Sequence, residues 1–260
     1  MAIKKILQDV LGEKRYLSLL AGTFQRLYPT GLLGKEYADV YFLKKIIRRG
    51  DCCVDIGAHL GYFTIELSRL TGDTGKVFAI EPMSPFHNTL QRLLQKKKAR
   101  NVTLYQVALG GKGEYVEMGI PRVGAVKRFA YARIMESNTN THMEFEETEK
   151  VRNESGDDLF LDLPRLDYIK CDVEGLEFQV FAYMTRTLEA HHPILLCELI
   201  EREQRIRLFE LLRPFGYRAY ALEQEKLIPL DVYAEGTIVS QNDYFIPPQH
   251  QQRLSHLIAG

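Results

Sequence analysis

Hydrophobic and polar positions follow a helical rhythm in the first 48 residues. Apolar residues recur three and four positions apart, which predicts amphipathic helices. The two clearest series are Ile3, Ile6, Leu7, Val10, Leu11 and Leu17, Leu19, Leu20, Phe24, Leu27. After the break at Pro29-Thr30-Gly31, a further helix is expected from Glu36 to Arg49, because Gly50 follows it. We therefore expect a helical extension over residues 1–49.

From residue 50 the pattern changes to short apolar runs that alternate with amphipathic segments. The apolar runs predict core strands over 52–56, 76–82, 101–109, 166–173 and 193–199. The amphipathic segments predict helices over 62–72, from Ser84 onward, over 175–188 and over 202–217. Residues 217–222 and 243–247 are typical of late, antiparallel strands. Strands that alternate with helices indicate an α/β domain over 50–260, with a mainly parallel sheet covered on both faces.

One polar stretch interrupts this alternation. Residues 121–158 lack a clear period, although residues 113–121 just before them are typical of an extra strand. We expect an insertion over 121–158 on the substrate side of the domain, since such loops frequently carry substrate contacts.

The segment CCVDIGAHLGYFT joins the first core strand to the next helix. Its glycines, Gly57 and Gly61, are spaced GxxxG, whereas nicotinamide dinucleotides require GxGxxG. Asp55 stands two residues before the loop, where a carboxylate would repel a diphosphate. S-adenosylmethionine fits better, because its ammonium and sulfonium suit an acid and its carboxylate suits the helix N-terminus. The alternative for Asp55 is a simple cap of the following helix.

A second acid, Glu81, ends the second core strand. Ligands of parallel α/β sheets bind beyond the carboxyl ends of the strands. A carboxylate in that place can accept hydrogen bonds from both ribose hydroxyls of an adenosyl cofactor. The alternative is a solvated acid at a strand end. Asp55 and Glu81 together, at the ends of consecutive strands, favour the cofactor interpretation.

Four motifs, taken in order, resemble the FkbM family of S-adenosylmethionine-dependent methyltransferases: GDCCVDIGAHLGYFT, FAIEP, LDYIKCDVEGLE and PILLCEL. The resemblance covers about residues 36–247, and the run IKCDVEGLE is its most specific part. It implies a class I methyltransferase (Rossmann-like) fold with a seven-stranded sheet, and methyl transfer to hydroxyls of small natural products, sugars or glycan-type acceptors. It also implies that Asp55, Gly57 and Gly61 lie at the methionine part of the cofactor, Glu81 at the ribose and residues 107–108 near the adenine.

The histidine of the glycine loop, His59, departs from the family pattern, which usually has asparagine there. Histidine can still donate a hydrogen bond, so His59 is kept as a site residue. The residues expected to bind S-adenosylmethionine are Asp55, Gly57, Ala58, His59, Gly61, Tyr62, Phe63, Thr64, Glu81, Pro82, Val107, Ala108 and Asp172.

Acidic residues also end the fourth and fifth core strands. Asp172 and Glu174 are two positions apart, so their side chains point the same way if the chain stays extended, and either one can act as a base or hold the acceptor hydroxyl. Glu198 ends the fifth strand, and the candidate catalytic residues are therefore Asp172, Glu174 and Glu198. The alternatives are that Glu174 organises its own loop, and that Asp172 and Glu198 hold a divalent metal. No tight metal-ligand motif is present, so no metal is expected.

Composition and charge narrow the class of partner. The formal net charge is zero, which gives no indication of nucleic-acid binding. The apolar runs are shorter than the roughly 20 residues of a membrane span, and the N-terminus shows no signal-peptide pattern. The basic residues of the helical extension suggest a solvated face, with an acidic partner or a membrane surface as the alternative. Buried free thiols in a reducing cytoplasm are expected for Cys52, Cys53, Cys171 and Cys197.

These features favour a cytoplasmic O-methyltransferase that acts on a hydroxyl of a small-molecule or saccharide acceptor. The alternative from another class is a module that binds S-adenosylmethionine or a nucleotide without catalysis, and the intact DVEG run argues against it. The loop spacing disfavours a nicotinamide oxidoreductase. The lack of a base-flipping motif disfavours a nucleic-acid methyltransferase. Acceptor identity and oligomeric state are left open by the sequence.

Overall fold

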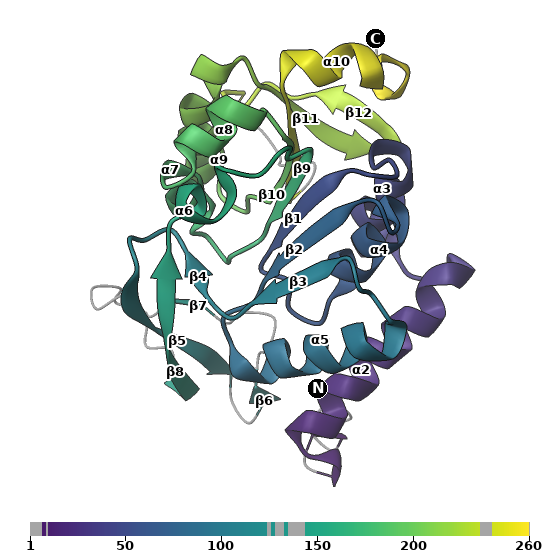
Figure 1. Cartoon of the computed structure of the whole chain (residues 1–260), viewed down its shortest axis with the longest axis vertical. Helices are drawn as coiled ribbons and strands as arrows, with labels where there is room; N and C mark the ends of the chain where they lie inside the picture. The colour runs from purple at the N-terminus through teal and green to yellow at the C-terminus, as the bar shows by residue number, and fades with distance from the viewer. Residues whose placement is uncertain are drawn as a thin grey trace.

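The computed structural model describes residues 7–8, 10–123, 126–127, 133–134, 144–234 and 241–259 of the chain. A sheet of eight strands forms its centre, in the order β12-β11-β13-β10-β9-β1-β2-β3 (Figure 1). The five strands from β10 to β3 are parallel, and β13, β11 and β12 are antiparallel to their neighbours. The strands are β1 (Cys52–Ile56), β2 (Lys76–Ile80), β3 (Val102–Tyr105), β9 (Tyr168–Cys171), β10 (Ile194–Glu198), β11 (Arg218–Glu223), β12 (Lys226–Pro229) and β13 (Asn242–Ile246). The α/β class with a mainly parallel sheet is thereby confirmed.

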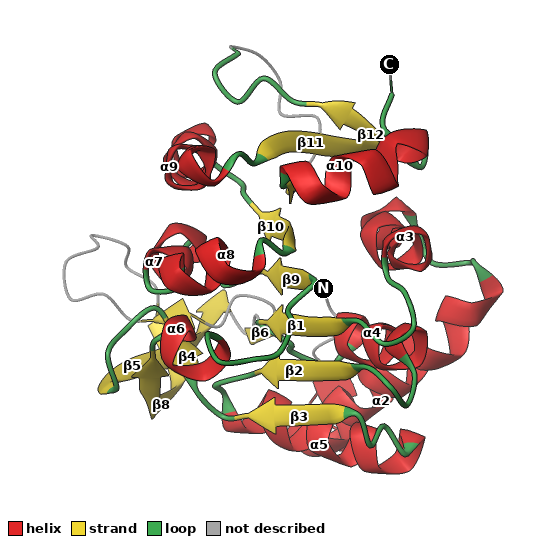
Figure 2. Cartoon of the chain, turned by 45° about the horizontal axis from the view of Figure 1, so that its top comes forward, coloured by secondary structure: helices red, strands yellow, loops and turns green. Residues whose placement is uncertain are grey.

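Helices cover both faces of this sheet, as Figure 2 shows. One face carries the N-terminal helices, with Phe24 and Val40 in the same apolar cluster as Leu196 and Tyr244 of the sheet. The helices of this face are α2 (Glu13–Leu27), α3 (Ala38–Ile46), α4 (Tyr62–Thr71) and α5 (Ser84–Lys97). The helices of the other face are α6 (Gly156–Phe160), α7 (Glu177–Ala182), α8 (Thr185–His191) and α9 (Arg202–Leu212). The helix α10 (Pro248–Leu254) follows the last strand, and short 3₁₀ turns lie at Tyr28–Thr30, Lys35–Tyr37, Arg213–Phe215 and Ser255–Leu257.

The sheet has one strand more than the seven that were expected. The additional strand, β12, forms a hairpin with β11 and buries Leu227 completely. The two residues of the turn, Gln224 and Glu225, both have positive φ angles of 45° and 64°. Such turns usually contain glycine or asparagine. This hairpin therefore had no recognisable turn signal in the sequence.

Two expected elements are divided in the structure. The strand expected over 101–109 ends at Tyr105, because the chain then leaves the main sheet and Ala108 pairs with Asn153 of a second sheet. The helix expected over 175–188 ends at Ala182 and restarts at Thr185 as α8. Asp157, which belongs to α6, caps the start of α8, since its Oδ1 accepts the backbone N–H of Thr187 at 2.7 Å. Caps contributed by distant residues cannot be recognised from helical spacing.

The second sheet is built around a long antiparallel pair, β5 and β8, which stands apart from the main sheet (Figure 1). Its strands are β4 (Ala108–Leu109), β5 (Glu114–Val123), β6 (Val126–Lys127), β7 (Arg133–Ile134) and β8 (Glu144–Glu154). The extra strand expected over 113–121 is thus confirmed, and the described part of the 121–158 insertion extends the same sheet. Glu149 of β8 joins it to α5 by accepting hydrogen bonds from the backbone N–H and the hydroxyl of Ser84.

All four cysteines are buried free thiols, as expected. Burial raises the pKa of Cys52 to about 11 and that of the other three well above the usual value, so these thiols are unreactive at neutral pH. Within the described ranges, no helix combines the length and the apolar character needed to cross a membrane.

Candidate active site

A buried lysine, Lys170, connects the strand ends where ligands of such sheets bind. Asp55, Lys170 and Leu196 are register partners on β1, β9 and β10, so their side chains share one face of the sheet. The Lys170 Nζ lies 3.5 Å from Asp55 Oδ1 and 3.4 Å from Asp172 Oδ2. It also donates hydrogen bonds to the carbonyls of Ile56 at 3.2 Å and Gly57 at 2.8 Å. Burial lowers the pKa of Lys170, but Asp172 and Asp55 raise it more, and the ammonium stays charged.

The carboxylate of Asp55 is completely buried behind the glycine loop. Its Oδ2 accepts a hydrogen bond from the hydroxyl of Thr64 at 2.5 Å, and its Oδ1 faces Lys170. Asp55 therefore contacts a protein ammonium in the structure, whereas the sequence suggested direct contact with the ammonium of the cofactor. These contacts tie Asp55 to Lys170 and to the first turn of α4.

The two glycines of the loop allow close approach between protein segments. A Cβ atom on Gly57, which has φ of 74°, would lie 1.9 Å from the carbonyl oxygen of Asp172. A Cβ atom on Gly61, with φ of 80°, would lie 2.4 Å from a methyl group of Leu90 on α5. The first glycine brings the loop after β1 against the loop after β9, and the second seats α4 against α5. The GxxxG spacing thus has a packing reason as well as the cofactor reason that the sequence suggested.

The acid at the end of β2, Glu81, is buried and supports the loop. Its Oε2 accepts the backbone N–H of His59 at 2.7 Å, and its Oε1 accepts that of Met83 at 3.0 Å. Burial raises the pKa of Glu81 to about 7, although these two hydrogen bonds and the charge of Lys170 lower it. Each carboxylate oxygen has a second lone pair, so Glu81 can accept further hydrogen bonds from ribose hydroxyls.

A Glu81→Gln variant should bind S-adenosylhomocysteine about tenfold to a hundredfold more weakly, because one acceptor oxygen becomes an amide donor facing a hydroxyl. Isothermal titration calorimetry measures this loss, and Glu189→Gln, at an exposed position of α8, is the matched control. An affinity equal to that of the wild-type protein would remove Glu81 from the ribose site.

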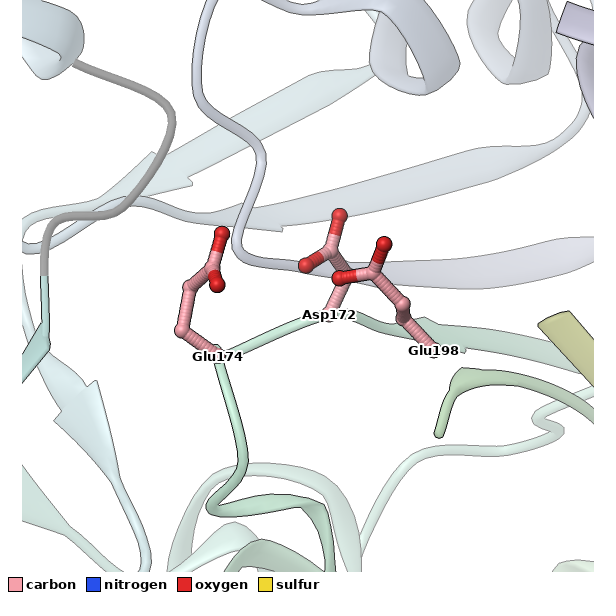
Figure 3. A group of neighbouring side chains, drawn as sticks. All are labelled: Asp172, Glu174 and Glu198. Carbon is pink, nitrogen blue, oxygen red and sulfur yellow. The ribbon is translucent and has the colours of Figure 1, made fainter. Parts of the chain in front are cut away.

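Three carboxylates converge beyond the ends of β9 and β10. One ligand oxygen of each of Asp172, Glu174 and Glu198 lies within 4.8 Å of the others. Figure 3 shows the carboxyl groups of Asp172 and Glu198 side by side, with Glu174 next to them on the loop after β9. Glu174 has a φ of 56°, so the chain is not extended there and the expected parallel direction of Asp172 and Glu174 is not what brings them together. The cluster can share a proton, and its donor set also suits a divalent cation.

Burial and neighbouring charges make the Glu198 carboxyl unusually basic. Its pKa is raised to about 8, chiefly by burial and also by the charge of Asp172, a hydrogen bond with Asp172 and the charge of Glu174. The charge of Lys170 partly opposes these effects. At neutral pH the Glu198 carboxyl is mainly protonated, and it becomes a base just above neutrality.

A cavity of about 170 Å³ opens beside these groups. The described residues that line it include Asp172 and Glu198 but not Glu174. Tyr62 and Phe63, at the start of α4, form part of its wall, and the Phe63 ring lies 5.5 Å from the Lys170 Nζ. The described residues of the lining are Glu36, Tyr37, Asp39, Val40, Tyr62, Phe63, Lys170, Cys171, Asp172, Leu196, Glu198 and Asn242.

The remaining residues expected at the cofactor lie around the glycine loop but outside this lining. His59 packs its ring 4.4 Å from that of Phe86, and Ala58 is buried, with its N–H donated to the Ile80 carbonyl. Pro82 lies between Glu81 and Met83, and residues 107–108 lie beyond the carboxyl end of β3. The sequence did not point to Tyr37, Asp39 or Asn242, because nothing in a single helix or strand indicates that segments two hundred residues apart line one cavity.

Residues 55–219 match the family described as Methyltransferase FkbM domain. This region is more than half of the chain, and the chain therefore belongs to the FkbM family of S-adenosylmethionine-dependent methyltransferases. The family match confirms the resemblance found in the sequence, and with the observed sheet it confirms the class I, Rossmann-like fold. None of the curated proteins compared matches the chain.

Several solved structures are similar to the chain. An FkbM methyltransferase from Methylobacillus flagellatus is 19% identical, with 79% of this chain and 50% of that chain covered and a TM-score of 0.46. An S-adenosylmethionine-dependent O-methyltransferase from Thermotoga maritima is 16% identical, with 80% and 63% covered and a TM-score of 0.46. Aeropyrum pernix fibrillarin, solved with natively bound S-adenosylmethionine, is 12% identical, with 80% and 72% covered and a TM-score of 0.43. The chain thus spans half of the first protein and less than two thirds of the second.

Proposed function

We propose that the chain transfers a methyl group from S-adenosylmethionine to a hydroxyl group of a small-molecule or saccharide acceptor. The observation that carries the proposal is the placement of Glu81 and of the pair Asp172 and Glu198 along one edge of the sheet. The first can hold a ribose, and the pair lines a cavity in which an acceptor hydroxyl can lose its proton. Both belong to the region that matches the methyltransferase family.

The residues around the glycine loop fit the cofactor. Glu81 retains lone pairs for the ribose hydroxyls, and the backbone N–H groups at the start of α4 lie at the positive end of a helix, which suits the carboxylate of the methionine part. Gly57, Ala58, His59, Gly61 and the first residues of α4 would hold that part, with Pro82, Val107 and Ala108 near the adenine. When bound, the cofactor supplies a methyl group on a positive sulfur, which departs as the neutral thioether of S-adenosylhomocysteine.

The chain's own contribution to the reaction is proton transfer and alignment. The acceptor hydroxyl gives its proton to the Glu198 carboxylate as its oxygen bonds to the methyl carbon and the carbon–sulfur bond breaks, with the electron pair left on sulfur. Asp172 accepts a hydrogen bond from the acceptor or from protonated Glu198, and Lys170 fixes Asp172 at 3.4 Å. Alignment of the reacting atoms contributes on the order of 7–11 kcal/mol in well-oriented reactions, and a positioned base about 10²–10⁴-fold in rate.

S-adenosylhomocysteine should raise the melting temperature of the chain, whereas NAD should leave it unchanged. A ligand at a hundred times its dissociation constant stabilises the folded state by about 2.7 kcal/mol, which corresponds to a shift of several degrees. Differential scanning fluorimetry with each compound is sufficient. Stabilisation by NAD alone would replace the proposal with a dinucleotide-dependent activity, while stabilisation by S-adenosylhomocysteine without transfer to any acceptor would favour a non-catalytic binding module.

A further inference from the structure

The cavity beside Glu198 is closed by a part of the chain that lies outside the family match. Of the twelve described residues that line it, five fall outside residues 55–219. Four of them come from the segment 36–40, which leads into α3, and the fifth is Asn242 at the start of β13. The region of the family match therefore supplies the reactive carboxylates of the cavity, and the segment 36–40, hereafter the entry wall, supplies a separate part of its lining.

A buried acid, Asp39, fixes the entry wall to the sheet. Its carboxylate accepts hydrogen bonds from Asn242 Nδ2 at 2.7 Å and from the Tyr244 hydroxyl at 2.8 Å. Burial raises the pKa of Asp39, and these two hydrogen bonds lower it. Asn242 is also the cross-strand partner of Glu198. The position of the entry wall is thus tied directly to the strand end that carries the proposed base.

Most of the described ionisable groups that line the cavity are acids. Of the described residues that line it, Lys170 alone is basic, and its three N–H bonds face four acceptors within 3.5 Å. Lys170 therefore has no donor left for an anionic ligand. Both Asp39 oxygens already accept hydrogen bonds and Glu198 is mainly protonated at neutral pH, but Asp172 and the exposed Glu36 also line the cavity as acids.

Aromatic rings form another part of the cavity lining. The rings of Tyr37 and Tyr62 lie 6.1 Å apart at 81°, and both line the cavity next to Glu36. Carboxylates combined with ring faces attract ammonium groups, since a cation interacts favourably with both. A carboxylate or phosphate on the ligand would meet the acids of the lining, while the Lys170 ammonium already faces four protein acceptors, and this combination is unfavourable.

We propose that the entry wall selects the acceptor, and that the acceptor is a hydroxylated molecule that carries a protonated amine. The amine lies against Glu36 and Tyr37, and the hydroxyl lies at Asp172 and Glu198. This inference rests on the proposed function, because it names the substrate class of the same site.

The test uses the full chain with S-adenosylmethionine carrying a labelled methyl group. Acceptors are offered in matched sets of three that share one scaffold and differ only in charge, for example glucosamine, glucose and glucuronic acid. The amine of each set should have a kcat/KM about tenfold above its neutral form, which lies between the effects of an exposed and a desolvated cation–π contact, and the acidic form should be the slowest. A neutral or acidic form that exceeds its amine, or the absence of transfer to every amine, would overturn the inference.

Two variants of the entry wall test whether it causes the preference for the amine. Glu36→Gln and Tyr37→Leu should each reduce the preference for the amine severalfold, with the affinity for S-adenosylhomocysteine unchanged. The same carboxylate-to-amide change at exposed Glu189 on α8 should leave the preference intact. A preference that survives both wall variants would show that recognition lies elsewhere. If S-adenosylhomocysteine does not bind the wild-type chain, the proposed function itself is wrong. If it binds but the amine is not preferred, only the proposed class of acceptor is wrong.

Discussion

A Glu198→Gln variant is expected to lose about 10²–10⁴-fold in kcat, with its affinity for S-adenosylhomocysteine unchanged. Glutamine keeps the size of the side chain and its place in the cavity wall, but it cannot take a proton from the acceptor. The measurement is transfer of a labelled methyl group to the acceptor that the wild-type chain methylates fastest. Glu189→Gln on α8 is the matched control and should retain full activity.

The same variant should change the pH dependence. In the wild-type chain, Glu198 must be ionised to act, and its pKa is raised to about 8 by burial and by Asp172. The wild-type kcat/KM should therefore rise with pH and level off above about 8. The residual activity of Glu198→Gln should lack this rise. A variant with wild-type turnover, or one that keeps the rise, would remove Glu198 from the chemistry.

Unfolding of the variant does not explain the expected loss of activity, because the raised pKa of Glu198 lowers the stability of the wild-type chain at high pH and not that of the variant. The pKa of Glu198 is raised from 4.5 on folding, so the folded chain holds an extra proton between about pH 4.5 and 8. The wild-type chain thus loses stability as the pH rises through this window, and Glu198→Gln does not. At pH 8 the variant should melt no lower than the wild-type chain.

The alternative role of the three carboxylates, as ligands of a metal, has its own test. Turnover that EDTA abolishes and Mg²⁺ restores would assign Asp172, Glu174 and Glu198 to a metal.

A Lys170→Met variant is expected to lose about 3–5 kcal/mol of unfolding free energy, the usual cost of leaving one partner of a buried ion pair alone. Lys170 is 4% exposed and Asp55 is fully buried, so methionine would leave the Asp55 charge without its ammonium. Equilibrium urea denaturation measures the loss as a lower midpoint at an unchanged slope.

A double-mutant cycle separates this charge effect from simple packing. Asp55→Asn added to Lys170→Met should recover part of the lost stability, because the orphaned charge is then removed. The two single losses would add if Asp55 and Lys170 acted independently. A Lys170→Met loss below about 1 kcal/mol, the range of exposed ion pairs, would show that the pair does not hold the strand ends together.

Local patterns predicted most of the sheet and one side of the site. The strand β1 and the helices α4 and α5 follow from apolar runs, glycine positions and the Ser84-Pro85 start, which are all local signals. Glu81 and the acids after β9 and β10 could be placed because parallel strands end at one edge. In the structure, Lys170 links the ends of β1 and β9 through its contacts with Asp55 and Asp172.

Long-range contacts account for what the sequence could not provide. Asp39 and Asn242 are separated by 203 positions, yet their hydrogen bond sets the entry wall of the cavity. The burial of Asp55 depends on Thr64 and Lys170 together, and no spacing rule distinguishes it from an acid at the loop mouth. Glu174 has a positive φ, which is uncommon for a residue other than glycine and has no local signal in the sequence.

A crystal structure of the chain with S-adenosylhomocysteine tests the central claim most directly. The account predicts ribose hydroxyls on the Glu81 carboxylate, the methionine part along the loop from Gly57 to Gly61, and the sulfur facing the cavity of Asp172 and Glu198. An adenosyl ligand bound elsewhere, or one that leaves Glu81 in contact only with the backbone of His59 and Met83, would contradict it.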